Sequence, residues 1–232
     1  MTQTPATSAL LAVVAGVLCA GLIGLGVWQV ERLAWKRALI AQVGARVHAT
    51  PAVAPGPAHW AAITAARDAY RHIATRGRYR DERATLVQAV TERGPGFWVM
   101  TPLVTDRGFT VLVNRGFVAG RGAIPPGGAA AVTGLLRLSE PGGAFLRRND
   151  PAGDRWFSRD VVAIAAARHA GAVAPYFIDA DAVPGAAANA PVGGLTVIRF
   201  TNNHLVYAIT WFILAAMAAA GAVVLLREAR RI

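Results

Sequence analysis

Two uninterrupted apolar stretches bracket a middle region in which apolar and polar residues alternate in short runs. Residues Leu10–Val30 and Leu205–Leu226 contain no charged side chain and are mostly apolar. Each exceeds the roughly 18 apolar residues that indicate a transmembrane helix, and at about 1.5 Å per residue each reaches across the hydrocarbon layer of a bilayer. The pattern therefore predicts a membrane protein. The predicted division is a first transmembrane helix at residues 8–30, a domain at 31–203, a second transmembrane helix at 204–226 and a basic tail at 227–232.

The middle region has the pattern of a mainly β domain. Short runs rich in β-branched and aromatic residues are separated by glycine and proline, which is typical of short strands. Asp106-Arg107-Gly108 lies between two such runs and predicts a tight hairpin turn. The predicted strands are Ile73–Tyr79, Ala84–Thr91, Phe97–Leu103, Thr110–Arg115, Ala131–Leu138, Tyr176–Asp179 and Thr196–Phe200. We expect them to form a mainly antiparallel sheet or a partly closed barrel.

A few helices complete the predicted fold. Glu31–Ala49 continues the first helix as a lead-in, and the prolines that follow end it. The alanine-rich run His59–Tyr70 predicts a second helix. Asp160–His169 predicts a third, with Asp160 as its N-cap and Gly171 just past its end. The predicted fold class is therefore two terminal transmembrane helices that flank a mainly antiparallel β domain with one or two helices.

Composition removes several classes of function. The one cysteine, Cys19, excludes a disulfide framework and any metal site built from several cysteines. The five histidines lack the His-x-His or His-x-x-x-His spacing of metal sites, and no serine lies in a Gly-x-Ser-x-Gly turn. The formal net charge is +11, but the arginines are scattered without the aromatic runs of nucleic-acid-binding modules. We therefore expect neither an enzyme nor a nucleic-acid-binding protein.

Membrane orientation is left open by the residues alone. The n-region Met1–Pro5 has no basic residue, which favours a retained anchor in a bacterial inner membrane over a cleaved signal or a mitochondrial transit peptide. The arginines at 227, 230 and 231 favour a cytoplasmic C-terminus and hence an external middle domain. Arg32, Lys36, Arg37 and Arg46, after the first stretch, favour the opposite orientation. Because long loops translocate largely regardless of their charge, the short C-terminal tail carries more weight.

Small residues recur every four positions in the first stretch, at Ala12, Gly16, Ala20 and Gly24. Such a stripe lets another helix approach closely. The second stretch contains a matching group of alanines and a glycine near Ala215. The stripe therefore indicates either pairing of the two helices with each other or docking onto a membrane helix of a partner.

His204 is the ionisable residue that opens the second stretch. On a helix, Tyr207, Trp211 and Ala215 follow it on one face. Ionisable groups at membrane depth are candidate functional residues. An interfacial histidine within an aromatic belt is the alternative interpretation.

The end of the first stretch carries a second group of this kind. Trp28, Arg32 and Trp35 share one helical face, with Gln29 and Lys36 beside them. Arg32 could pair with anionic lipid headgroups or with the carboxylates of a bound amphiphile. Together with an imidazole ligand, such a group would suit a flat apolar ring system with acidic tails.

Several motifs resemble those of the Surfeit locus protein 1 family. Gly26-Val-Trp-Gln-Val-Glu-Arg-Leu-Ala-Trp-Lys36 resembles the motif at the family's first span, and Asn202-Asn-His-Leu-Val-Tyr-Ala-Ile-Thr-Trp-Phe212 the motif that opens its second. Gly96–Leu103 and Val111–Val118 resemble the family's central block in the same order. Asn149-Asp150-Pro151, Trp156-Phe157 and Asp160 also fit, and Phe117 stands where tryptophan is common.

The resemblance implies an assembly factor for a haem-copper terminal oxidase, cytochrome c oxidase, that binds haem a transiently as cargo and assists its insertion into the catalytic subunit. His204 would be the axial ligand of the haem iron, Arg32 and Lys36 would face the propionates, and Trp28, Tyr207 and Trp211 would wall the ring. The resemblance also implies a periplasmic domain with both termini in the cytoplasm. The implied partners are the oxidase catalytic subunit, the haem a synthase and membrane lipid. The alternative is a membrane scaffold that stabilises the oxidase subunit and never binds haem.

Overall fold

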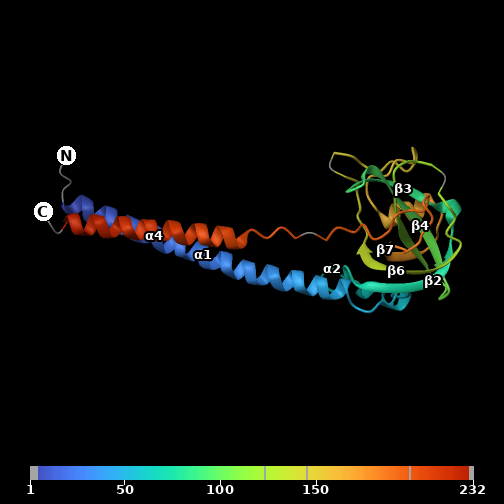
Figure 1. Ribbon diagram of the computed structural model, residues 1–232, viewed down its shortest axis with the longest axis horizontal. Coiled ribbons are helices and arrows are strands. Elements are labelled where there is room, and N and C mark those ends of the chain that lie inside the picture. The colour runs from blue at the N-terminus through green and yellow to red at the C-terminus, as the bar shows by residue number, and fades with distance from the viewer. Residues whose placement is uncertain (1–4, 123, 145, 199, 230–232) are drawn as a thin grey trace. The chain divides into compact units, whose positions relative to one another are not determined.

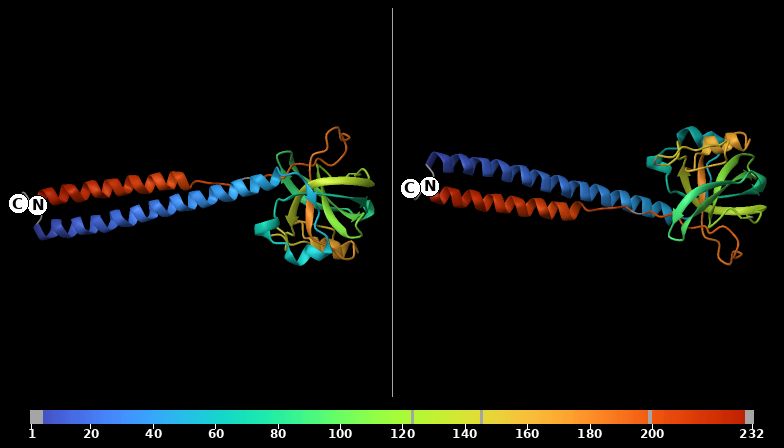
Figure 2. Two further views of the ribbon diagram at one scale, coloured as in Figure 1. Left: turned by 90° about the horizontal axis from the view of Figure 1, so that it is seen from below. Right: turned by 90° about the horizontal axis from the view of Figure 1, so that it is seen from above.

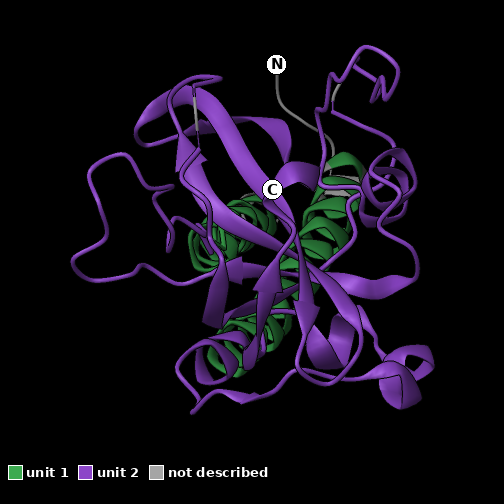
Figure 3. Cartoon of the chain, turned by 90° about the vertical axis from the view of Figure 1, so that its right-hand side faces the viewer, with its two compact units in different colours: residues 1–42, 199–232 green, residues 43–198 purple. Residues whose placement is uncertain are grey.

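A computed structural model of the chain describes residues 5–122, 124–144, 146–198 and 200–229. The chain divides into two compact units (Figure 3). Unit 1 comprises residues 1–42 and 199–232, and unit 2 comprises residues 43–198. The two ends of the chain therefore belong to one unit, and the middle forms another.

Unit 1 consists mainly of two long helices, and residues 43–47 at the end of the first one belong to unit 2. Helix α1 spans Pro5–Val47 and helix α4 spans His204–Ala229, and the two lie side by side in every view (Figures 1 and 2). The segments Ala9–Val47 and His204–Arg227 are long and apolar enough to cross a membrane. Helix α1 continues without a break from the predicted first span into the predicted lead-in. Of the predicted basic tail, residues 230–232 lie outside the described residues.

Unit 2 is built on a seven-stranded mixed sheet. Strand β2 pairs with both β6 and β4, so that β2, β6, β7, β5 and β4 form a closed ring. The β1–β2 and β5–β7 pairs are parallel, and the other pairs are antiparallel. The strands are β1 (Ala52–Val53), β2 (His72–Tyr79), β3 (Thr85–Thr91), β4 (Gly94–Thr105), β5 (Thr110–Val118), β6 (Ala129–Leu138) and β7 (Val173–Ala180).

Six of the seven predicted strands correspond to observed strands, β2 to β7. The predicted hairpin joins β4 to β5, where the N–H of Gly108 donates to the carbonyl of Thr105 and Gly108 has a φ of 81°. The prediction of a strand at Thr196–Phe200 is wrong for the residues that the structure describes there, 196–198 and 200, which form no regular structure. Strands β5, β6 and β7 are each already paired along both edges, so this segment cannot join any of them as a further strand. The two-residue strand β1 was not predicted.

The helices of unit 2 are short. Helix α3 (Val161–Ala167) begins after Asp160, whose side chain accepts from the N–H of Ala163 as an N-cap. The single helix predicted at His59–Tyr70 is instead a 3-10 helix, η1 (Pro57–Ala62), and a one-turn helix, α2 (Ala65–Asp68). Thr64 separates them because its backbone is extended and its hydroxyl caps α2. A further 3-10 turn, η2 (Asp81–Arg83), joins β2 to β3.

The core of unit 2 has two parts on opposite faces of the same strands. Along β7, Tyr176 and Ile178 belong to one cluster and Phe177 to the other, which follows the alternation of side chains in a strand. All five ring strands contribute to the first cluster, so it fills the interior of the ring. The second cluster packs the outer face against α3 and against Trp156, which is 1% exposed. The fold class is confirmed: two apolar terminal helices flank a mixed, mainly antiparallel sheet domain.

Candidate functional site

Helices α1 and α4 pack against each other along faces whose residues recur every seven positions. Buried and half-buried residues alternate at spacings of three and four on both helices, which is the spacing of paired helices in a coiled coil. They are Ala12, Ala15, Cys19, Leu22, Gly26, Gln29 and Leu33 on α1, and His204, Ala208, Trp211, Ala215, Ala218 and Ala222 on α4. Most of these side chains are small, so the two backbones can approach closely.

Three contacts set the register of the pair. The Sγ atom of Cys19 lies 3.4 Å from the carbonyl oxygen of Ala215. A Cβ atom added to Gly26 would lie 2.6 Å from Cε1 of Phe212. Gln29 contacts His204. Since residue numbers rise along α1 as they fall along α4, the helices are antiparallel.

The pairing face differs from the predicted small-residue stripe. Ala12 is 8% exposed and belongs to the pairing face. Gly16, Ala20 and Gly24 are exposed, and a Cβ atom added to either glycine would meet no atom within 4 Å. The two helices therefore pair through Cys19 and Gly26 rather than through the four-residue repeat.

His204 forms a hydrogen bond across the helix pair. Its Nδ1 atom lies 2.7 Å from Oε1 of Gln29, whose residue is only 9% exposed. His204 itself is half-buried. The structure records no hydrogen bond of Nε2 with any described residue. One ring nitrogen is thus occupied by the protein, and the other has the capacity to bind a ligand.

The predicted aromatic residues do not all lie on the face that holds His204. Trp211 is half-buried on the pairing face, as predicted, but Tyr207 is 53% exposed and Ala208 takes the buried position. On α1, Trp28 is 50% exposed, and its neighbour Gln29 is the residue that reaches His204. On α1 the pairing face is therefore displaced by one residue from the predicted face, whereas on α4 three of the four predicted residues, His204, Trp211 and Ala215, lie on it.

The predicted cations lie at the same end of the helix pair. The guanidinium of Arg32 stacks on Trp35, with 4.5 Å from Cζ to the ring centroid, and both residues are exposed. The ammonium of Lys36 lies 5.5 Å from the ring centroid of Phe200, in the segment that leads into α4. Lys36 is half-buried on the pairing face, and Arg32 is not.

An unpartnered polar atom lies two residues before His204. The Oδ1 atom of Asn202 is buried and has no hydrogen-bond partner among the described residues. Buried polar atoms almost always have a partner. Asn202 therefore has an unused hydrogen-bonding capacity that water, a bound molecule or another protein can fill. Sequence reasoning named Asn202 and Gln29 as neighbours of the candidate residues but assigned neither of them a role, although the recurrence of Cys19, Gly26 and Leu33 every seven residues was a signal for the face that contains Gln29.

Unit 2 has its densest polar cluster around Asp179, which is 4% exposed. Arg137 and Arg159 each donate to its carboxylate at 2.9 Å, and Asn114 and Thr196 donate at 2.8 and 3.0 Å. Both arginines also bind Glu140. Every member has a protein partner, which is the arrangement of a structural network.

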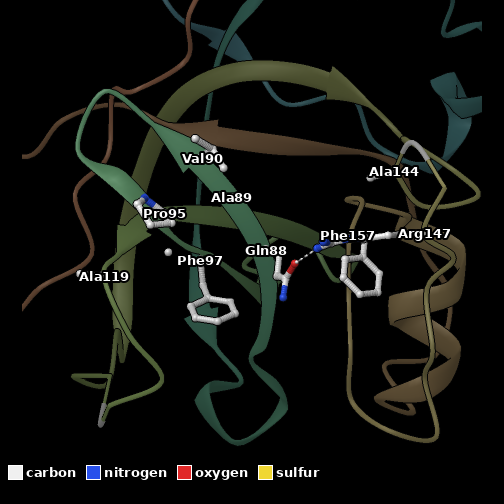
Figure 4. Close-up of a pocket in the computed structure, with 10 residues that line it drawn as sticks. Gln88, Ala89, Val90, Pro95, Phe97, Ala119, Ala144, Arg147 and Phe157 are labelled. Atoms are coloured by element: carbon white, nitrogen blue, oxygen red, sulfur yellow. Dashed lines mark hydrogen bonds between the residues drawn. The ribbon is translucent and has the colours of Figure 1, made fainter.

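A groove of about 710 Å³ is lined by residues of β3 and β4 and by the segments around Ala119, Ala144 and Phe157 (Figure 4). Phe97 and Phe157 line it, and Arg147 bonds to Gln88 across it at 3.2 Å. Val90, on β3, is 86% exposed. Arg147 is the one charged residue of its described lining, so this lining holds neither a general acid–base pair nor a nucleophile with its base.

A second cavity, of about 390 Å³, lies between β2, β6 and the loop 181–193. Burial raises the pKa of Tyr79 in its wall to about 12, and the Arg115 guanidinium above the ring only partly opposes that effect. Tyr79 is therefore a neutral phenol at physiological pH. Over the described part of the chain, no group of three or more His, Cys, Asp or Glu side chains could hold a metal ion.

Comparison with known proteins covers nearly the whole chain. Residues 16–216 match the sequence model of the SURF1 family. The chain is 35% identical to human Surfeit locus protein 1 over 220 residues, which cover 83% of this chain and 70% of the human protein. It is 34% identical to a SURF1-like protein of Monosiga brevicollis, with 88% and 83% of the two chains covered, and 32% identical to a SURF1-like protein of Drosophila melanogaster, with 83% and 70% covered.

Proposed function

This chain belongs to the SURF1 family, and from that membership together with the His204 site we propose that it is an assembly factor for a haem-copper terminal oxidase, cytochrome c oxidase. Its cargo would be haem a, which it binds transiently and helps to insert into the catalytic subunit. The observation that carries the haem-binding part is the state of His204: one ring nitrogen is held by Gln29 and the other has no recorded partner among the described residues.

The residues around His204 fit a porphyrin with acidic side chains. An imidazole nitrogen supplies the iron ligand. Lys36 and Arg32 lie at the same end of the helix pair and supply positive charge for the two propionates. Asn202 contributes an amide whose oxygen has no partner among the described residues. Trp211, Tyr207 and Trp28 supply aromatic surface on and beside the pairing face.

The close packing of the two helices restricts where the cargo can lie. Gly26 and Phe212 are in contact, so there is no space for a macrocycle between the helices at that level. We therefore place the haem against the flank of the pair, at the level of His204. An exposed flank also suits a cargo that has to be released, since a single accessible ligand can be replaced more readily than a buried cage.

The proposed location is the inner membrane of a bacterial cell, with two spans, both termini in the cytoplasm and unit 2 in the periplasm. The apolar outer faces of α1 and α4 would contact lipid, and exposed Arg32 and Trp35 would lie at its interface. The proposed partners are the oxidase catalytic subunit and the haem a synthase. No catalytic step is assigned to this chain.

Purification of the full-length protein from cells that make haem a tests the proposal. We expect a Soret band in the wild-type protein that is lost in His204→Ala. His48→Ala is the matched control, because His48 is an exposed histidine whose Nδ1 atom binds the carbonyl of Gly44, and it should retain the band.

Circular dichroism and crosslinking of the helix pair would establish that His204→Ala leaves the fold intact. Identical spectra for wild type and His204→Ala would contradict haem ligation. The Gln29–His204 bond would then be a structural clip between the helices, which favours a scaffold that stabilises the oxidase subunit without touching haem.

A further inference from the structure

The Gln29–His204 contact joins two side chains from different helices, 175 positions apart in the sequence. The oxygen Oε1 of a glutamine amide only accepts hydrogen bonds. With Oε1 facing Nδ1 of His204 at 2.7 Å, the hydrogen bond forms when Nδ1 carries the hydrogen. A neutral imidazole has one N–H, so Nε2 then carries the lone pair.

We propose that Gln29 is a positioning residue that holds His204 in the tautomer whose Nε2 can bind iron. The role of this tautomer in binding iron rests on the proposed function. The tautomer itself is a property of the ligand-free protein. A histidine that binds a metal through one nitrogen almost always donates its other N–H to an acceptor, which fixes the orientation of the ring and raises its basicity as a ligand. Gln29 supplies that acceptor from the neighbouring helix.

The surroundings of Gln29 give its amide few other partners. On the pairing face, Gly26 precedes it by three residues and Leu33 follows it by four, and neither has a polar side chain. Ala208 follows His204 by four residues and is 2% exposed. The packing largely excludes water from the Gln29 side chain. Of these neighbours, His204 is therefore the one that can offer a hydrogen-bond donor to the Gln29 oxygen.

Gly26 leaves room for a side chain of the partner helix next to this contact. It has no side chain, and a Cβ atom at that position would overlap the ring of Phe212. With that ring seated against Gly26, the side chain of Gln29, one turn further along α1, reaches Nδ1 of His204 at the start of α4. The glycine, the glutamine and the histidine therefore form one unit that orients the imidazole.

The first test measures the tautomer without any haem. In full-length protein labelled with 15N-histidine and held in mildly alkaline buffer in nanodiscs, long-range 15N–1H correlations identify which ring nitrogen is protonated. We expect His204 to be protonated at Nδ1 in the wild type and to shift toward the Nε2-protonated form in Gln29→Leu. Protonation at Nε2 in the wild type would overturn the proposal, because the glutamine would then donate through its amide nitrogen.

The second test measures retention of haem. We expect Gln29→Leu to weaken it about 10- to 100-fold, the usual effect of removing the partner of a metal-binding histidine. Gln29→Glu keeps an acceptor oxygen and should restore most of the affinity. Gln42→Leu is the matched control, since Gln42 is exposed on the same helix, and it should bind haem as the wild type does. Equal affinity for wild type and Gln29→Leu would refute the positioning role.

The two measurements separate this inference from the proposed function. If the wild type binds no haem but shows the Nδ1–H form that Gln29→Leu loses, the orientation of His204 by Gln29 stands and the haem-carrying function fails. If the wild type binds haem while the tautomer is indifferent to Gln29, the function stands and the inference fails. Disulfide formation between Cys19 and an Ala215→Cys substitution reports whether each variant keeps the helix pair intact.

Discussion

The Asp179 cluster of unit 2 and the His204 end of unit 1 satisfy their polar groups in opposite ways, although unit 2 also holds one buried polar atom without a partner among the described residues, Oγ1 of Thr101. In unit 2, the carboxylate of Asp179 is 4% exposed and accepts hydrogen bonds from two arginines, an asparagine and a threonine. In unit 1, the pairing face consists mainly of small apolar residues, and His204 has a single recorded partner there. The oxygen of Asn202 has none among the described residues. A network in which every polar group has a protein partner is rigid. Unpaired hydrogen-bonding groups, in contrast, can bind water, a ligand or another protein.

The two units also differ in what they bury. Unit 2 buries large side chains such as Trp156, Tyr176 and Phe177 in two clusters. Unit 1 buries three alanines, Gly26, Gln29 and Leu33, and leaves most of its large apolar side chains, including Leu10 and Met217, facing outward. Outward apolar faces are stable only when lipid or another apolar surface covers them. Burial of large side chains therefore drives folding of unit 2, and close backbone packing determines the association of α1 with α4.

Breaking the network of unit 2 should have the largest effect. Asp179→Ala leaves the guanidinium groups of Arg137 and Arg159 buried with one carboxylate, Glu140, between them. Removing one partner from a buried ion pair costs about 3–5 kcal/mol. We expect a loss of that size in the free energy of unfolding, measured by chemical denaturation of the full chain with a probe in unit 2.

Asp150→Ala is the control for this substitution. Asp150 also binds an arginine, Arg155, through two contacts, but both side chains are exposed. Exposed ion pairs contribute little to stability. If both substitutions reduced stability equally, the distinction between a buried structural network and surface pairs would be wrong.

A bulky residue where Gly26 contacts Phe212 should have an intermediate effect. Gly26→Val places a Cβ atom in the ring of Phe212, and because that ring is 39% exposed and can turn aside, we expect a cost at the lower end of the about 1–3 kcal/mol typical of overpacking. In an Ala215→Cys background, disulfide formation with Cys19 reports the association of the helices. We expect Gly26→Val to reduce it and unit 2 to keep its stability.

Gly24→Val is the matched control, because a Cβ atom at Gly24 meets no atom within 4 Å. It should leave disulfide formation unchanged. A loss in Gly24→Val that equals the loss in Gly26→Val would indicate that the exposed small-residue stripe takes part in pairing after all.

Local signals allowed much of unit 2 to be predicted from sequence. The Asp106-Arg107-Gly108 turn and the Asp160 cap depend on a few adjacent residues, and both are confirmed. Strand β1 and the predicted strand at Thr196–Phe200 depend instead on which edges of distant strands remain free. The pairing of β2 with β4, which closes the ring, decides which edges remain free, and no pattern of adjacent residues predicts this long-range pairing.

The site in unit 1 was harder to predict for a different reason. Apolar residues surround both helices, so hydrophobicity does not distinguish the face toward the partner helix from the face toward lipid. Aromatic residues therefore suggested Trp28 and Tyr207, whereas Gln29 and Ala208 occupy the pairing face. The seven-residue spacing of small and polar residues carries the information, because only the pairing face requires small side chains.

The smallest expected effect concerns a second histidine and sharpens the comparison with His204. Both ring nitrogens of His72 are engaged: Nδ1 lies 2.9 Å from the carbonyl of Ala49, and Nε2 lies 2.7 Å from the carboxylate of Asp181. Burial lowers the pKa of His72, but the hydrogen bonds to Asp181 and Ala49 outweigh it, so the pKa is raised in the folded state. Two acceptors favour the doubly protonated ring, whereas the single recorded acceptor at His204 leaves one nitrogen for a ligand.

A raised pKa in the folded state gives a defined pH dependence. The stabilisation from His72 is complete below the unfolded pKa, about 6.5, and is lost as the pH rises through the folded value. Asp181 is 39% exposed, so solvent screening limits the effect to on the order of 0.3 kcal/mol. We expect the free energy of unfolding of unit 2 to fall by that amount above neutral pH in the wild type and to stay level in His72→Gln. A decrease of the same size in His72→Gln would assign the pH dependence to another group. It would also remove the contrast between His72, which is held at both ring nitrogens, and His204, which is held at one.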